Sequence, residues 1–451
     1  MKFGDILHGI IQDVDDHGCG IWPIVREGQN DGSSLNVIVP HATPGDEVDA
    51  RFIKRDRGRR VTQLETVTVP GPDRIAAACP HASVCGGCLW QHLDYPAQLR
   101  LKLRMLNRAF ESAQHVERID QIQPATDIWH FRNRMDYVIG WQSEVGLKAY
   151  GTWNKYLDLQ TCLILDETTP TILQCVRDLM RELALEPWDN RRHIGLMRYV
   201  VIREGKHMHE RMITLVVHQA DQINVKARQR IIEQLAPLCT TLFIGENPEL
   251  TDISICSRLD LLHGKPLLQE EVNGLHYDIH PNSFFQTNSD MAAELQKTVL
   301  EFLELNVKKQ KVLDLYCGLG FFGIACAKEG ATVYGHELDA PMIELAKHNA
   351  ELNQVKTSCT WGSGPVEKLD WAHLQPDAVI VDPPRSGLHP RALKTLLENP
   401  VATLVYVSCN YHAFVKELTA LKTVYNVTEM RALDLFPHTP HLELVIKLTK
   451  K

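Results

Sequence analysis

The sequence lacks the long apolar run that a membrane-spanning helix requires. No stretch approaches the about 18 consecutive apolar residues of such a helix. Its first residues, MKFGDILHGIIQDVDD, contain neither the basic start nor the apolar core of a secretory signal. Internal repeats and low-complexity tracts are also missing. These absences argue against integral membrane proteins, secreted proteins and repeat arrays, so we expect a cytoplasmic, globular protein that does not contact membranes.

An excess of positive charge is missing as well. The chain has 48 Lys and Arg residues against 56 Asp and Glu residues, a net charge of −8. Proteins that bind nucleic acids usually show a basic surplus or a basic patch. Local basic runs do occupy residues 51–60 and 99–108, and Arg132 and Arg134 follow them. One such run is usually a solvated surface, but three in the first third of the chain favour a nucleic-acid partner.

Twelve cysteines occur in a chain with no sign of secretion. Disulfides are rare in a reducing compartment, where cysteines more often bind metals or catalyse reactions. Cys79, Cys85 and Cys88 lie close together in CPHASVCGGC, and Cys162 is the best candidate for a fourth ligand. Four cysteines would suit zinc. We favour an iron–sulfur cluster, because the two glycines before Cys88 free backbone amides to approach cluster sulfides.

Composition and periodicity divide the chain into three parts. Residues 1–70 contain short apolar runs separated by Gly, Pro and Asp, which is typical of a small, OB-like β-barrel. Residues 71–270 mix strand-like and helix-like runs and carry the cysteine cluster, so we predict a central α/β domain there. Residues 271–451 alternate short apolar runs with helices, the pattern of a mostly parallel, Rossmann-like sheet covered on both faces. The sequence therefore predicts a multidomain protein.

A glycine-rich loop follows the first parallel strand predicted in the C-terminal domain. In DLYCGLGFFG, residues 314–323, three glycines let the backbone turn tightly and approach a ligand. Glu337 ends the next predicted strand, where a carboxylate can accept hydrogen bonds from both hydroxyls of a ribose. The loop therefore indicates a ribose-containing ligand, either a nicotinamide dinucleotide or S-adenosylmethionine.

Two features of the last third favour a methyltransferase over a dehydrogenase. VDPPRSG, residues 381–387, places Asp382 at the carboxyl edge of the predicted sheet, where ligands bind in open α/β folds. Its Pro-Pro step fixes an extended loop that presents Arg385 to a planar substrate. The last two predicted strands, 425–436 and 441–448, suit the reversed hairpin that closes a methyltransferase sheet.

Cys409 ends a buried strand in LVYVSCNYHAF, residues 404–414. An ordinary buried cysteine is the commoner explanation of such a position. However, Asn410 and the start of the next predicted helix supply dipoles that favour a thiolate. A thiolate that adds to C6 of uracil makes C5 nucleophilic enough to accept a methyl group, and a base must then remove the C5 proton. If the methyl acceptor is this carbon, the reaction needs a nucleophile, and Cys409 is the candidate.

Glu443 is the candidate for that base. In FPHTPHLELVIKL it lies between two leucines, and apolar neighbours raise the pKa of a carboxyl, which suits proton abstraction near neutrality. His438 and His441 are alternative bases. A solvent-facing position on an edge strand is the other interpretation of Glu443.

Five segments together resemble the RNA uracil-5-methyltransferase family: NSFFQTN, LDLYCGLGFFG, DPPRSG, VSCN and PHTPHLE. The resemblance implies a class I fold that transfers a methyl group from S-adenosylmethionine to C5 of a uridine in RNA. It also implies that Cys409 is the nucleophile and Glu443 the base. Two positions differ from the family pattern, since Phe321 and Gly364 stand where many members have Asn. The residues that the resemblance places at S-adenosylmethionine are Gln286, Tyr316, Phe321, Glu337 and Asp382.

The cysteine spacing and the N-terminal part are similar to the members of this family that act on 23S ribosomal RNA. That likeness implies a [4Fe-4S] cluster on Cys79, Cys85, Cys88 and Cys162, and an N-terminal RNA-binding TRAM domain in DVDDHGCGI and the strands after it. We expect a monomer that methylates 23S ribosomal RNA. The alternatives are a tRNA uracil-5-methyltransferase, an amino-directed nucleic-acid methyltransferase and a non-catalytic RNA-binding iron–sulfur protein.

The target uridine must leave its base stack to reach Cys409. Phe284, Phe285 and Phe436 are aromatic residues near the predicted site that would be able to stack against it. Core packing is the commoner role for each of them.

Overall fold

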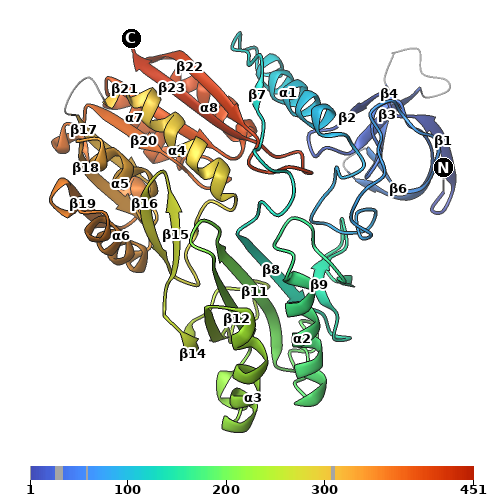
Figure 1. Ribbon diagram of the computed structural model, residues 1–451. Coiled ribbons are helices and arrows are strands. Elements are labelled where there is room, and N and C mark those ends of the chain that lie inside the picture. Colours follow the sequence, from blue (N-terminus) through green and yellow to red (C-terminus); the bar gives the residue numbers. More distant parts are fainter. Residues whose placement is uncertain (1, 26–33, 57–58, 306–309) are drawn as a thin grey trace. The chain divides into compact units, whose positions relative to one another are not determined.

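The computed structural model describes residues 2–25, 34–56, 59–305 and 310–451 (Figure 1). The chain forms two compact units that interleave along the sequence. Unit 1 contains Met1–Arg108, Lys148–Asn154 and Phe436–His441, and unit 2 contains Ala109–Leu147, Lys155–Leu435 and Leu442–Lys451. No helix in the described ranges has both the length and the apolar character needed to cross a bilayer. The predicted division at residues 70 and 270 stays a prediction.

In its described residues, unit 1 contains a six-stranded sheet, as the short apolar runs of the first seventy residues predict. Gly9 lets the first strand pass directly over the Trp22 indole, which a Cβ at position 9 would overlap. The buried side chains beneath the sheet include Ile11, Val37 and Val48. The strands, in their order across the sheet, are β1 (Ile6–Ile10), β5 (Glu47–Asp56), β6 (Arg59–Val69), β4 (Ser34–Val39), β3 (Gly20–Val25) and β2 (Asp13–Val14).

The basic runs of unit 1 are partly neutralised by neighbouring carboxylates. Helix α1 (Tyr95–Ser112) carries Arg104 and Arg108, whose guanidinium groups lie 3.1 and 2.9 Å from carboxylate oxygens of Asp13. In the run 51–60, Lys54 and Arg55 are exposed, and residues 57 and 58 lie outside the described ranges. Part of the positive charge in these runs is therefore neutralised, while the exposed basic side chains of β5 stay available to a nucleic acid.

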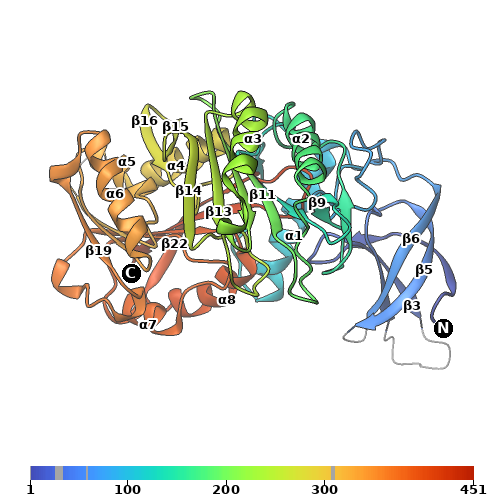
Figure 2. The same ribbon diagram turned by 90° about the horizontal axis from the view of Figure 1, so that it is seen from below.

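Within the described ranges, unit 2 contains two large sheets. The first has seven strands, of which β12 and β13 run parallel while β8, β11 and β12 are antiparallel neighbours. Two helices in contact with each other, α2 (Thr169–Glu182) and α3 (Val225–Leu235), lie beside it (Figure 2). Its strands, in order, are β10 (Tyr156–Asp158), β9 (Val145–Lys148), β8 (Arg134–Ile139), β11 (Met197–Gly205), β12 (Glu210–Val217), β13 (Thr241–Glu246) and β14 (Arg258–Gly264).

The second sheet of unit 2 has eight strands and confirms the predicted α/β alternation. Strands β19 to β21 in spatial order are parallel, and β23 runs antiparallel between β21 and β22, which is the predicted reversed hairpin. Its strands, in order, are β19 (Cys359–Ser363), β18 (Thr332–Glu337), β17 (Lys311–Leu315), β20 (Ala378–Val381), β21 (Thr403–Ser408), β23 (Glu443–Lys450), β22 (Tyr425–Leu433) and β7 (Ile122–Gln123).

Helices cover both faces of this second sheet, so its central strands β20 and β21 are buried along nearly their whole length (Figure 2). One face carries α4 (Ser289–Leu303), α5 (Phe321–Lys328) and α6 (Ala340–Leu352), and the other carries α7 (Pro390–Glu398) and α8 (Tyr411–Leu421). Short 3₁₀ turns connect several elements of unit 2: η1 (Ala220–Gln222), η2 (Ala236–Leu238), η4 (Lys356–Ser358), η5 (Val366–Lys368) and η6 (Ala372–Leu374).

A small hairpin, β15 (Leu268–Val272) and β16 (Leu275–Ile279), leads into the segment before α4. Two asparagines of α6 hold it, because the amides of His276 and Asp278 each donate to an Asn side-chain oxygen at 2.9 Å, on Asn353 and Asn349 respectively. This attachment fixes where residues 280–288 begin.

Candidate active site

Cys409, Glu443 and Asp382 meet at one end of three adjacent strands. The antiparallel register pairs Ser408 of β21 with Leu444 of β23, so the next pair outward is Cys409 and Glu443. Strand β20 lies on the other side of β21 and ends at Val381, one residue before Asp382. The sheet topology therefore gathers three residues that are far apart in the sequence.

The Cys409 thiol is half-buried at this edge, which is not the closed core position of an ordinary structural cysteine. Burial is the largest cause of a pKa raised to about 11; the Glu443 and Asp382 carboxylates also raise it when ionised, while Arg385 and the backbone act in the opposite direction. The net direction is opposite to the lowered pKa expected from Asn410 and the helix start. Burial together with the neighbouring carboxyls outweighs those dipoles, so the resting thiol is protonated at neutral pH.

Glu443 is buried, with 2% of its surface exposed. Its pKa lies well above the usual carboxyl value because of burial first and the Asp382 charge second, with Arg385 opposing them. The raised pKa confirms the expected direction. A solvent-facing place on an edge strand is wrong for Glu443, because β23 is flanked by β21 and β22. Asp382 as a whole residue is partly exposed, but burial of its carboxyl raises its pKa to about 7.

The loop that follows Asp382 is held from both sides. The Asn410 side chain donates to the Arg385 carbonyl at 2.8 Å, and the Leu388 amide donates to a Glu417 oxygen at 2.8 Å. Gly387 has φ +81°, and a Cβ there would overlap the same Glu417 carboxylate. Glu417 lies on α8 and was not anticipated from the sequence, where only the glycine hinted at a tight approach.

The glycine-rich loop between β17 and α5 leaves room for a ligand. Tyr316, Gly318 and Gly320 all have positive φ, at 63°, 53° and 92°. A Cβ at Gly318 would meet nothing within 4 Å, so the space above this residue is open. The Gly318 amide donates to Glu337 Oε2 at 3.1 Å, which places the predicted ribose-binding carboxylate against the loop.

Asp314 lies directly beneath this loop and is fully buried. Its Oδ2 accepts from the Gly323 amide at 2.8 Å, while its Oδ1 has no hydrogen-bond partner among the described residues. Burial raises the pKa of Asp314 to about 8. The open space above Gly318 and the Glu337 carboxylate beside it are called here the Gly318–Glu337 cradle. This cradle and the unsatisfied Asp314 oxygen together fit a nucleoside ligand such as S-adenosylmethionine.

The segment before α4 brings Phe285 and Gln286 to the same region. The Phe285 ring packs at 5.6 Å from the Phe321 ring, whose residue starts α5. Gln286 is buried, and its carbonyl accepts from the Asn133 side chain at 2.8 Å. Phe321 is itself buried, so its ring fills the core where many relatives are expected to have Asn. Phe284, in contrast, is 68% exposed, so core packing is the wrong role for it.

The alternative bases lie in unit 1. His438 is buried there. Its amide donates to Gln98 Oε1 at 2.8 Å, and its ring Nδ1 lies 3.2 Å from Gln98 Nε2. His441 is exposed. The Glu443 charge, in contrast, acts on Cys409.

The predicted cluster cysteines are divided between the two units. Cys79, Cys85 and Cys88 belong to unit 1 and Cys162 to unit 2. The Gly87 amide donates to Cys85 Sγ at 3.4 Å, as expected from free amides in this loop. Nevertheless, no group of three or more Cys, His, Asp or Glu side chains is arranged to hold a metal ion in the described part of the chain. The iron–sulfur cluster therefore stays a prediction.

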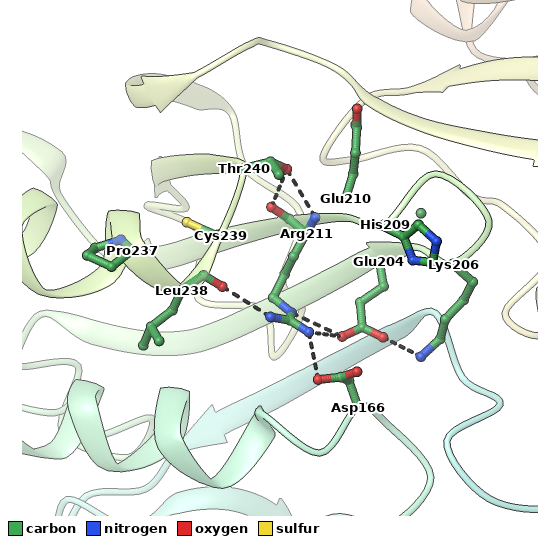
Figure 3. Close-up of a pocket in the computed structure, with 11 residues that line it drawn as sticks. Asp166, Glu204, Lys206, His209, Glu210, Arg211, Pro237, Leu238, Cys239 and Thr240 are labelled. Carbon is green, nitrogen blue, oxygen red and sulfur yellow. Dashed lines mark hydrogen bonds and ion pairs between the residues drawn. The ribbon is translucent and has the colours of Figure 1, made fainter.

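A cavity of about 380 Å³ lies elsewhere in unit 2, at the ends of β11 and β12 (Figure 3). Arg211 dominates it, with Nη2 at 2.7 Å from Asp166 and 3.0 Å from Glu204, which also binds Lys206. These charges neutralise one another, so the network supports the seven-stranded sheet. None of the predicted site residues lines this cavity.

Known proteins resemble this chain over nearly its whole length. A family model described as tRNA (Uracil-5-)-methyltransferase matches residues 95–359 and 365–451. A tRNA (uracil(54)-C(5))-methyltransferase of Pyrococcus furiosus is 33% identical over 98% of this chain and 100% of its own length. A 23S rRNA (uracil(747)-C(5))-methyltransferase of Pyrococcus horikoshii is 32% identical over 99% of this chain and 100% of its own.

A solved structure agrees with these sequence matches. The crystal structure of Pyrococcus abyssi tRNA (uracil-54, C5)-methyltransferase in complex with S-adenosyl-L-homocysteine superposes with a TM-score of 0.80 and 32% identity. The match covers 98% of this chain and 100% of that one. It therefore extends through the multidomain architecture and includes the eight-stranded class I sheet.

Proposed function

This chain belongs to the tRNA (uracil-5-)-methyltransferase family, and from that membership we propose that it transfers a methyl group from S-adenosylmethionine to C5 of a uridine in RNA. The observation that carries the proposal is the meeting of Cys409, Glu443 and Asp382 at the carboxyl edge of the sheet that also holds the Gly318–Glu337 cradle. A nucleophile, a buried base and a nucleoside site on one sheet edge are what C5 methylation requires.

Cys409 begins the reaction. Its thiol gives up a proton, Sγ bonds to C6 of the flipped uracil, and the C5–C6 π electrons move towards O4. The bound donor supplies a methyl group on a sulfonium, from which C5 takes the methyl carbon while the carbon–sulfur bond breaks. Glu443 then removes the C5 proton, the C5–C6 double bond forms again, and the C6–Sγ bond breaks to release Cys409.

The charges at the site suit these steps. The proton that leaves Cys409 needs an acceptor, and Asp382, whose pKa burial raises to about 7, is the candidate. Glu443 has a pKa well above the usual value, so once ionised it is a strong base for the C5 proton. Arg385 is the positive group whose charge acts on both Cys409 and Glu443. Two roles for two carboxyls follow from their different environments.

The RNA substrate has two candidates. The spacing of Cys79, Cys85 and Cys88 favours 23S ribosomal RNA, and the Pyrococcus horikoshii relative carries that name. Transfer RNA is the second candidate, because the Pyrococcus furiosus relative and the superposed crystal structure are both tRNA U54 enzymes by name. We propose a cytoplasmic monomer whose N-terminal sheet acts as an OB-like TRAM barrel for either RNA.

The [4Fe-4S] cluster on Cys79, Cys85, Cys88 and Cys162 is proposed from the sequence spacing alone. No step of the methyl transfer is assigned to it, because the thiols do not form a metal-binding group in the described residues. Iron and acid-labile sulfide analysis of protein purified without oxygen tests it. Stoichiometric iron that is lost in a Cys85→Ser variant supports the cluster, and iron-free, fully folded protein refutes it.

The main experiment uses labelled S-adenosylmethionine with unmodified tRNA and, separately, unmodified 23S ribosomal RNA, and maps the product by mass spectrometry. We expect 5-methyluridine in one of the two RNAs, no product with Cys409→Ala, and full activity with the control Cys175→Ala on α2. Full activity of Cys409→Ala would instead indicate an amino-directed enzyme. Failure of the wild-type protein to bind S-adenosylmethionine would indicate a non-catalytic RNA-binding protein.

A further inference from the structure

His336 is a buried polar side chain that the proposed reaction does not use. It is the penultimate residue of β18, next to Glu337, and only 5% of its surface is exposed. Neither ring nitrogen has a hydrogen-bond partner of normal geometry within the described ranges. A buried polar group without a partner is unfavourable, so such groups usually mark a ligand or water site.

The His336 ring lies beside the Tyr334 ring, with 6.4 Å between the ring centroids, and beside two glycines. Gly362 and Gly364 lie on the neighbouring strand β19 and the loop after it. A Cβ at Gly362 would overlap Tyr334 Oη and come within 3.1 Å of His336 Nδ1, so a larger residue there would displace these side chains. At Gly364 a Cβ would lie 3.9 Å from Nε2. The Nε2 atom therefore faces a position at which this chain has no side chain.

Position 364 is held in a conformation that favours glycine. Its φ is +142°, and its amide donates to the Glu337 carbonyl at 2.9 Å. This φ is strained for any residue with a Cβ. The glycine is therefore fitted to the backbone, and a polar contact at this place has to come from another residue.

The geometry of the cradle indicates which part of the ligand reaches His336. Gly318 and Glu337 receive the ribose, and Glu337 ends β18. The next strand outward is β19, so a base attached to that ribose extends over the ends of β18 and β19. Adenine presents an amino donor and a ring-nitrogen acceptor on one edge, and a neutral imidazole is able to donate or accept. Burial lowers the pKa of His336, which keeps the ring neutral.

We propose that His336 recognises the adenine edge of S-adenosylmethionine, in place of a side chain at position 364. This inference rests on the proposed function, because it assumes an adenosine ligand in the Gly318–Glu337 cradle. His336 then determines the choice of base, while Glu337 determines the choice of sugar.

Calorimetry on the full-length protein tests the inference without turnover. The probes are S-adenosylhomocysteine and its deaminated analogue S-inosylhomocysteine, in which an oxo group replaces the amino donor. We expect wild-type protein to bind the adenine compound at least about tenfold more tightly, since each lost hydrogen bond to a buried group costs about one order of magnitude in affinity. In His336→Phe the preference should largely disappear, and in His336→Gln it should partly return.

His373→Phe is the matched control, because His373 is exposed on η6. It should leave both affinities unchanged, and circular dichroism should show all variants folded. Equal affinities of wild type and His336→Phe for both compounds would overturn this inference alone. Failure of wild-type protein to bind either compound would overturn the proposed function as well, so the two failures are distinguishable.

Discussion

Replacing Glu443 by Gln removes the proposed base while keeping the size of the side chain. The first two bonds of the reaction, Sγ–C6 and C5–methyl, form before the C5 proton leaves. Without a base, the C6–Sγ bond has no route to elimination. We therefore expect Glu443→Gln to accumulate a covalent complex of protein and methylated RNA, which migrates slowly on denaturing gels and carries label from the methyl donor.

The same substitution should make the Cys409 thiol more reactive, because it removes a negative charge that raises the pKa of this thiol. The pKa of this thiol is about 11 against an ordinary value of 9.0, and burial is the largest cause, with Glu443 second and Asp382 third. Loss of the Glu443 charge should therefore lower this pKa, and a fall of about one pKa unit corresponds to roughly 1.4 kcal/mol. The thiolate fraction then rises up to about tenfold, and because nucleophilicity falls with pKa, alkylation should accelerate about three- to fourfold.

Iodoacetamide labelling followed by peptide mass spectrometry measures this effect. The difference between Glu443→Gln and wild type should widen from neutral to alkaline pH, because wild-type Glu443 acts on the thiol only after it loses its own proton. Cys175, on the outside of α2, is the internal reference, and Glu398→Gln on the exposed end of α7 is the charge-matched control. Unchanged labelling at alkaline pH, together with absence of the covalent complex, would refute the assignment of Glu443.

Three further outcomes are expected. Asp314→Asn should become more stable than wild type as the pH rises from about 4 to about 8. The reason is that burial raises the pKa of Asp314 to about 8 in the folded protein, so wild type loses stability when this carboxyl must ionise. Thermal melting at pH about 4 and about 8 measures whether the stability difference grows in this direction. Glu417→Ala should lower the unfolding free energy by about 2 kcal/mol, because two hydrogen bonds, from Leu388 and Tyr406, are lost. It should also reduce kcat and leave the affinity for S-adenosylhomocysteine unchanged. An equal loss of kcat and of this affinity would contradict a role confined to the loop after Asp382. Phe284→Ala should raise KM for RNA roughly five- to 150-fold, the range for about 1–3 kcal/mol of base stacking, with unaltered calorimetry for the cofactor product; an unchanged KM would leave this exposed ring without a role in RNA binding.

The C-terminal sheet was predictable because its strands are buried on both faces. Runs such as residues 378–381 and 404–407 are apolar throughout and are separated by amphipathic helices, a pattern with few alternatives. The central region was not predictable in the same way. Its sheet is mixed, with one parallel pair among antiparallel ones, and Lys148–Asn154 leaves unit 2 to join unit 1. Such long-range pairings have no local sequence signal.

The site residues divide along the same line. Cys409, Glu443 and Asp382 were predicted from motifs at the ends of strands, and the order of strands in the sheet brings them together. Glu417 and His336 were missed, because no local pattern connects them to their partners. Leu388 lies 29 residues from Glu417, and Gly364 lies 28 residues from His336. A glycine was the sole local sign in both cases, and a glycine alone does not say which side chain approaches it.

The direction of the Cys409 pKa shows why electrostatics is the hardest part to read from a sequence. The helix start after Asn410 is local and favours the thiolate, and it is visible in the sequence. The carboxylates of Glu443 and Asp382 reach the thiol only through the strand order, and each is itself buried and reluctant to ionise. A dipole at a helix end amounts to half a charge, and burial of the thiol, the largest cause of its raised pKa, exceeds it. The resting enzyme therefore keeps its nucleophile protonated, and Cys409 must pass its proton to a neighbouring group before it attacks.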